Sequence, residues 1–160
     1  MINLHFLSRL LNRWIEYLLF GLGFSMAVIV AVQVFFRYVL NQSLFWSEEL
    51  ARFMLVWLTF LGASVAYHRG VHPGIDMLYT RLPAAWQRLT AIFVHLVSIA
   101  FFVVMIVYGV QFSYFVRLQI SPALYLPKWI IFAIIPVSGA ILLVHALAFL
   151  LQEIRGRGTP

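Results

Sequence analysis

The chain contains no cysteine and very little charge, and these two shortages set the first limits on what it can do. Without cysteine it has no disulfide, no thiolate nucleophile and no thiolate metal ligand. Only 10% of its 160 residues are charged, whereas 64% are hydrophobic. This composition is typical of a polytopic membrane protein, and it leaves too little polar chain for a separate soluble domain.

Four apolar stretches are long enough to cross a bilayer, whose hydrocarbon core of about 30 Å requires roughly 20 residues of helix. We place the spans at about residues 15–38, 45–67, 89–114 and 128–151. Before them, residues 1–14 have polar and apolar side chains on opposite helical faces, which is typical of an interfacial amphipathic helix. The expected fold is an all-α membrane protein: one integral membrane domain over residues 1–160, with four transmembrane helices and an N-terminal interfacial helix.

Lysine and arginine are unevenly distributed around the expected spans, and this distribution predicts the orientation of the protein. Three of these residues lie on one side and seven on the other: Arg37, Arg117 and Lys128 against Arg9, Arg13, Arg69, Arg81, Arg88, Arg155 and Arg157. The positive-inside rule then places both termini in the cytoplasm. The net charge of +6 therefore reflects the orientation of the protein in the membrane. The chain has no soluble basic face that could bind nucleic acid.

The sequence FWSEELARF places charged residues at the start of the second span. Glu48 and Glu49 precede Arg52 by four and three residues, so on a helix both carboxylates can reach its guanidinium. Arg37, across a short turn, is a second candidate partner for a carboxylate. One uncompensated charge in a membrane helix costs roughly 2.5–3.5 kcal/mol, so the cluster must face protein or water. We interpret it as a structural lock or a partner interface, with an ion or proton site as the alternative.

Small residues and one proline predict where helices approach one another and where one bends. Two pairs have a spacing that permits close packing, within the chain or against a partner: Gly23 with Ala27, and Gly62 with Ala66. Pro136 lies inside the fourth span, where it frees the carbonyl of Phe132 and predicts a kink. No other span contains proline and no internal repeat is visible, so the chain lacks the paired broken helices of self-contained transporters.

Two histidines lie at similar depths in the expected third and fourth spans, His95 and His145. Two histidines at one level can ligate a haem iron, so a haem-bearing four-helix anchor of a respiratory enzyme is an alternative function. Polar contacts between helices explain the same pair, and we expect no cofactor. His68 and His72 are also four residues apart, but no third metal ligand accompanies them.

Four motifs resemble those of a known family, the small DctQ-like membrane subunit of tripartite ATP-independent periplasmic (TRAP) transporters. They are FRYVLNQSLFWSEELARF, FLGASVAYHRGVHPGIDML, SPALYLPKW and IIPVSG, and they follow one another in the family's order from Phe36 to Gly139. The second motif contains a loop, expected on the cytoplasmic side, whose family pattern falls on Arg69, Gly70, His72 and Asp76.

The resemblance implies a division of labour among three proteins. In such transporters a periplasmic binding protein captures a carboxylate-bearing substrate, and a large membrane subunit moves it using a sodium gradient. The small subunit supports the large one. The chain is therefore expected to be a non-enzymatic accessory subunit in the bacterial inner membrane, with the large subunit, the binding protein and membrane lipids as partners. A small oligomeric transporter or a membrane enzyme is the remaining alternative.

Overall fold

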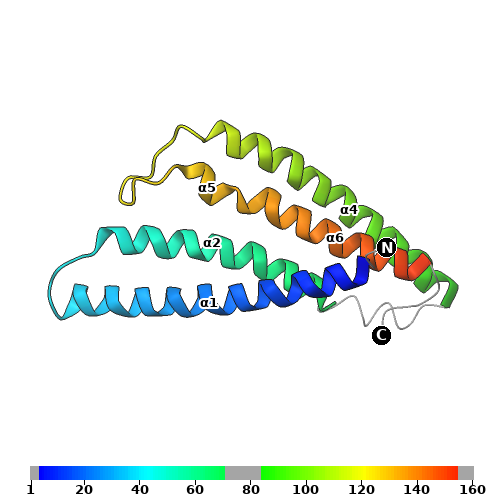
Figure 1. Ribbon diagram of the computed structural model, residues 1–160, viewed down its shortest axis with the longest axis horizontal. Helices are drawn as coiled ribbons and strands as arrows, with labels where there is room; N and C mark the ends of the chain where they lie inside the picture. The colour runs from blue at the N-terminus through cyan, green and yellow to red at the C-terminus, as the bar shows by residue number, and fades with distance from the viewer. Residues whose placement is uncertain (1–3, 71–83, 155–160) are drawn as a thin grey trace.

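The computed structural model describes residues 4–70 and 84–154, which form a bundle of helices (Figure 1). Its helices are α1 (Leu4–Tyr38), α2 (Phe45–His68), α4 (Ala84–Phe115), α5 (Lys128–Phe132) and α6 (Ile134–Ile154). Four segments are long and apolar enough to cross a membrane: Phe6–Tyr38, Phe45–His68, Leu89–Phe115 and Lys128–Ile154. The all-α fold with four spans is therefore confirmed.

The first helix is longer than a bilayer core is thick. α1 runs without a break over 35 residues, and at 1.5 Å per residue it is about 52 Å long. The hydrocarbon core is only about 30 Å thick. The boundary expected near residue 14, between an interfacial helix and the first span, is therefore not a break in the helix. That the first turns lie along a membrane surface stays a prediction.

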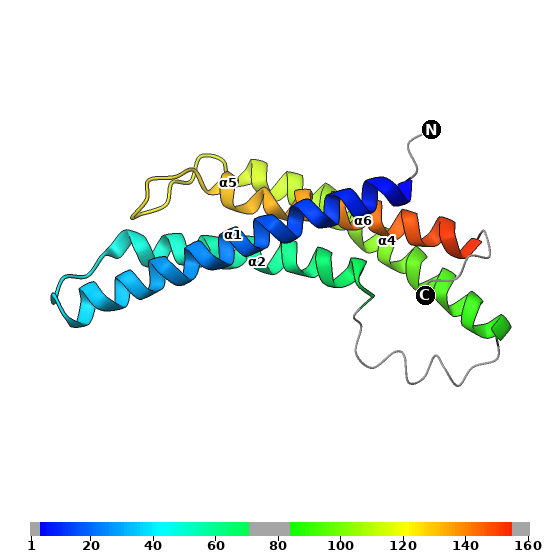
Figure 2. The same ribbon diagram turned by 60° about the horizontal axis from the view of Figure 1, so that its bottom comes forward.

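The helices form two antiparallel pairs. α1 packs against α2, whereas α4 packs against α5 and α6, and the most extensive contact is between α4 and α6. α6 also contacts α2 and α1, and Figure 2 shows α1 crossing over it. In Figure 1 the pairs lie apart at one end of the molecule, which holds the connections 39–44 and 116–127.

We name the two ends of the bundle after one carboxylate each. The Glu49 end comprises residues 37–49 and 116–128, and the Glu16 end comprises residues 4–16, 67–70 and 145–154. The core consists of two clusters of buried apolar side chains, one joining α1, α2 and α6 and one joining α4 and α6. Their buried members are Ile15, Leu61, Val65 and Ile134 in the first cluster, and Phe102, Leu142 and Ala146 in the second. In lipid, such contacts stabilise through close packing, because lipid tails are as apolar as leucine.

The fourth span is divided where the sequence predicts a kink. The helix is interrupted at Ala133, between α5 and α6 and three residues before Pro136. Pro136 has no N–H to donate to the carbonyl of Phe132. The N–H of Ala133 bonds to the carbonyl of Trp129 at 2.8 Å, which closes α5.

Candidate functional site

The charged cluster at the Glu49 end differs from the expected one. Neither Glu48 nor Glu49 contacts Arg52, which is exposed and has no carboxylate within 4 Å among residues 4–70 and 84–154. The expected pairs within α2 are therefore wrong. Glu48 instead faces Arg37 of α1, at 3.5 Å between Oε1 and Nη1, and both side chains are largely exposed. That second expected partner is present, and it joins the first two helices.

Glu49 has a role that sequence reasoning missed. Its Oε2 accepts hydrogen bonds from the backbone N–H groups of Ala123 and Leu124, at 2.7 and 3.1 Å. The segment containing these amides is also held internally, since Ser121 and Leu126 exchange hydrogen bonds of 2.9 and 3.1 Å. The carboxylate thus fixes the connection between α4 and α5 to the start of α2. Backbone amides in a turn leave no residue pattern, so the sequence carries no signal for this contact.

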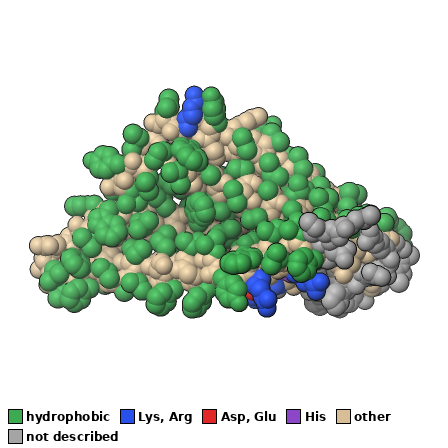
Figure 3. All heavy atoms as spheres, viewed as in Figure 1, with side chains coloured by type: hydrophobic (Ala, Val, Ile, Leu, Met, Phe, Trp, Pro, Cys, Tyr) green, Lys and Arg blue, Asp and Glu red, His purple; other side chains and the backbone are tan. Residues whose placement is uncertain are grey.

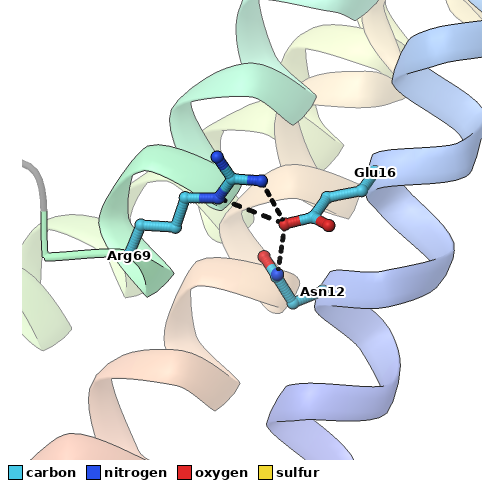
Figure 4. Close-up of polar contacts among 3 residues, drawn as sticks. All are labelled: Asn12, Glu16 and Arg69. Atoms are coloured by element: carbon cyan, nitrogen blue, oxygen red, sulfur yellow. Dashed lines mark hydrogen bonds and ion pairs between the residues drawn. The ribbon is translucent and has the colours of Figure 1, made fainter.

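The Glu16 end contains the closer of the two ion pairs found in the described part of the chain (Figure 4). Arg69 donates from Nη2 and Nε to Glu16 Oε1, at 2.8 and 3.2 Å. The same oxygen accepts a hydrogen bond of 2.8 Å from Asn12 Nδ2. Arg69 follows the last residue of α2, so this group joins the end of α2 to α1. Figure 4 shows the three side chains converging on that carboxylate oxygen.

The start of the family-motif loop is visible next to this ion pair. Gly70 has φ = +66°, a left-handed conformation that favours glycine, and its N–H bonds to the carbonyl of Tyr67 at 3.2 Å. Gly70 thus ends α2 and helps to set the position from which Arg69 reaches Glu16. His72 and Asp76, the other expected residues of this motif, lie outside the described residues.

The histidines at the Glu16 end make contacts between helices. His145 is fully buried in α6, and its Nδ1 shares a hydrogen bond of 2.7 Å with Ser8 Oγ of α1. The ring of His68 packs against it, with 4.8 Å between ring centroids. His95 Nδ1 in α4 contacts the hydroxyl of Tyr67 in α2, at 3.3 Å. The polar interhelical contacts predicted for His95 and His145 are therefore present, and each ring uses one nitrogen for them. No group of three metal-ligating side chains occurs in residues 4–70 and 84–154.

The closest helix packing is not at the expected small residues. Within the described part of the chain, a Cβ on Gly62 would meet nothing within 4 Å, and one on Gly23 would only just reach Leu58, at 4.0 Å. Ala27 and Ala66 are exposed. No described helix therefore packs closely at Gly62, Ala27 or Ala66. The alternative, contact with a partner, stays a prediction.

Two other glycines bring α4 and α6 together. A Cβ on Gly109 would lie 2.9 Å from Cδ and 3.0 Å from the backbone nitrogen of Pro136. A Cβ on Gly139 would lie 3.0 Å from Cγ1 of Ile106. Each position therefore needs glycine for the close approach of the facing helix. A lone glycine inside an apolar helix is the signal that could have identified Gly109.

The central parts of the four spans contain no charged side chain. Aspartate, glutamate, lysine and arginine are absent from residues 17–36, 53–68, 89–116 and 129–152. Several hydroxyl groups there donate to carbonyls of their own helix, which satisfies them in an apolar setting: Ser25 to Gly21, Thr59 to Leu55, Ser64 to Leu61, and Ser138 to Ile135. Figure 3 shows apolar side chains over most of the visible face, with Lys and Arg at few places.

Comparison with known proteins agrees with this arrangement. The chain matches the sequence profile of the family described as tripartite ATP-independent periplasmic transporters, DctQ component, over residues 26–156. It is 28% identical over 138 residues to the isethionate TRAP transporter permease protein DctMQ of Oleidesulfovibrio alaskensis, covering 79% of this chain and 21% of that protein.

Two further relatives are small permease proteins. A putative TRAP transporter small permease protein of Haemophilus influenzae is 31% identical over 81 residues, covering 51% of this chain and 50% of the relative. The ectoine TRAP transporter small permease protein TeaB of Halomonas elongata is 28% identical over 127 residues, covering 78% and 66%. The chain thus spans half or less of the length of the first two relatives. With the family profile matching most of its length, the chain belongs to the DctQ component family of TRAP transporters and is a multi-pass protein of the bacterial inner membrane.

Proposed function

We propose that the chain is a scaffold subunit that supports a large permease subunit and transports nothing alone. The large subunit moves a carboxylate-bearing substrate with a sodium gradient, and a periplasmic binding protein delivers that substrate. The two termini of the small subunit are cytoplasmic, which places the Glu49 end in the periplasm. The family membership supports the association with a large subunit.

The absence of charge from the centre of all four spans carries this proposal. A coupling ion or an anionic substrate crossing the membrane needs polar groups or freed backbone at mid-depth. Aspartate, glutamate, lysine and arginine are absent there, His95 and His145 each use one ring nitrogen for a contact between helices, and four hydroxyl groups donate to carbonyls of their own helix. The charged residues instead join helices at the two ends: Arg37 with Glu48 and Arg69 with Glu16. These contacts stabilise a bundle and form no path across it.

The partner surface is expected among the exposed small residues. Helices in lipid associate by close packing at small side chains, and Gly62 and Ala66 of α2 lie one helical turn apart with open space at Gly62. Because no described residue fills that space, a helix of the large subunit can approach α2 closely there.

Reconstitution in liposomes tests the scaffold function. We would prepare vesicles with this chain, with the large subunit, and with both, then add binding protein, substrate and a sodium gradient. Uptake is expected only when all components are present. The matched control is the complete system without the sodium gradient. Uptake by this chain without the large subunit, or full uptake without this chain, would contradict the proposal.

A further inference from the structure

A mostly apolar cavity opens at the Glu49 end and has no role in the proposed scaffold. Its volume is about 320 Å³, within the range of small-molecule pockets. Residues of α2, α4, α5 and the connection before α5 line it: Phe53, Phe112, Phe115, Val116, Gln119, Lys128, Ile131 and Phe132. Six of these eight are apolar, so the interior suits a hydrocarbon chain.

The two polar lining residues lie at the edge of the membrane spans. One span ends at Phe115 and the next begins at Lys128, so Gln119 and Lys128 lie at the level where hydrocarbon gives way to headgroups. Trp129, next to Lys128, is 46% exposed, and tryptophan is enriched at that level. The cavity therefore has an apolar interior and a polar border at the depth of a phospholipid phosphate.

The charges at the polar border of the cavity determine which lipid headgroup it can bind. Lys128 Nζ donates to Gln119 Oε1 at 3.2 Å, and within the described chain no carboxylate lies within 4 Å of it. Arg117, directly after the lining residue Val116, also lacks a carboxylate; its guanidinium carbon lies 3.6 Å from the centroid of the Tyr114 ring. The nearby Glu49 is already engaged by two backbone amides. Lys128 is therefore a cation that lines an apolar cavity and has no counter-charge among the described residues.

We propose that this cavity binds an acyl chain of an anionic glycerophospholipid whose phosphate contacts Lys128. The acyl chain packs against the phenylalanine side chains, and the net negative charge of the headgroup complements Lys128. A zwitterionic lipid fills the same cavity without that complement, so it binds more weakly.

Native mass spectrometry of the full chain in detergent tests this site. We would titrate phosphatidylglycerol and phosphatidylcholine with identical acyl chains. Wild type is expected to prefer phosphatidylglycerol, and Lys128→Gln is expected to weaken its binding about fivefold, since one basic residue contributes about that factor near an anionic surface. Lys128→Arg should keep the preference. Arg13→Gln, which removes one exposed charge at the opposite end, is the matched control and should also keep it.

A second variant tests the acyl chain. Val116→Trp fills the cavity and is expected to weaken binding of both lipids, with folding checked by circular dichroism. If wild type shows no preference, or if Lys128→Gln binds phosphatidylglycerol like wild type, the proposal is wrong. It is also wrong if folded Val116→Trp binds both lipids normally but fails to assemble with the large subunit, because the cavity then receives an apolar side chain of that partner.

Discussion

The carboxylate of Glu49 accepts a hydrogen bond of 2.7 Å from the backbone N–H of Ala123, which joins the start of α2 to a residue 74 positions further along the chain. The adjacent N–H of Leu124 donates to the same oxygen. One side chain thereby determines where the connection between α4 and α5 lies at the Glu49 end.

Replacing Glu49 should release that connection. Glu49→Ala leaves two partly buried N–H groups without an acceptor, and we expect a loss of about 1–3 kcal/mol in unfolding free energy. Hydrogen exchange should accelerate at Ala123 and Leu124. The matched control is Glu48→Ala, which removes only an exposed pair of 3.5 Å and should cost less than about 1 kcal/mol. Equal exchange rates in the two variants would contradict this role of Glu49.

The glycines of α4 and α6 give a second prediction. Gly109→Ala forces a Cβ against the backbone of Pro136, and such overpacking costs about 1–3 kcal/mol. Gly62→Ala places its Cβ in open space and gains up to about 1 kcal/mol of helix propensity. Thermal unfolding of the isolated subunit should therefore shift in opposite directions. A shift of both variants in the same direction would refute the packing described for Gly109.

A third prediction concerns the buried hydrogen bond between Ser8 and His145. Among residues 4–70 and 84–154, His145 Nε2 has no hydrogen-bond partner, so Ser8→Ala leaves both buried ring nitrogens without one in this part of the chain. We expect a loss of about 1–3 kcal/mol, measured by denaturation in mild detergent. Ser25→Ala is the control, because Ser25 is exposed and bonds only to its own helix. Should the two serine variants unfold alike, the contact contributes nothing.

Arg52→Ala tests the corrected reading of the charged cluster. The intrahelical pairs expected from the sequence would make this change strongly destabilising, but Arg52 is exposed and contacts no carboxylate of the described residues. We now expect a change within about 0.5 kcal/mol in the isolated subunit. Weaker assembly with the large subunit would fit a partner contact. A large loss of stability in the isolated chain would restore the expected ion pairs.

The orientation can be measured with single cysteines, since the chain has none of its own. Tyr125 is 78% exposed at the Glu49 end, whereas Ser121 in the same segment is only 1% exposed. Tyr125→Cys in intact spheroplasts should react with a membrane-impermeant thiol reagent, and Arg13→Cys should react only after lysis. The reverse pattern would place the termini in the periplasm.

The helices were largely predictable because the thickness of a bilayer sets the length of the apolar stretch that crosses it. The expected spans of 45–67 and 128–151 compare with Phe45–His68 and Lys128–Ile154 in the structure. The first helix was harder to predict, because a change of amphipathic pattern near residue 14 does not interrupt a helix whose hydrogen bonds continue. The kink was predictable because proline has no backbone N–H and so cannot donate the helix hydrogen bond at its position.

The contacts between distant residues were much less predictable. Spacing along α2 placed Glu49 near Arg52, but the structure offers Glu49 two backbone amides from a segment 74 and 75 residues away. Likewise, the spacing of Gly62 and Ala66 indicates that another helix could approach closely there. It does not indicate that such a helix is present. Which faces meet depends on tertiary packing, which residue spacing within one helix does not encode.

The absence of charged side chains from the central parts of the four spans also bears on how the protein is made. A basic or acidic residue at the centre of a helix costs roughly 2.5–3.5 kcal/mol during insertion by the translocon, and none of the four spans carries that cost. Each helix can therefore leave the translocon laterally and rest in lipid before its neighbours arrive. The chain can therefore be inserted before any partner subunit is synthesised.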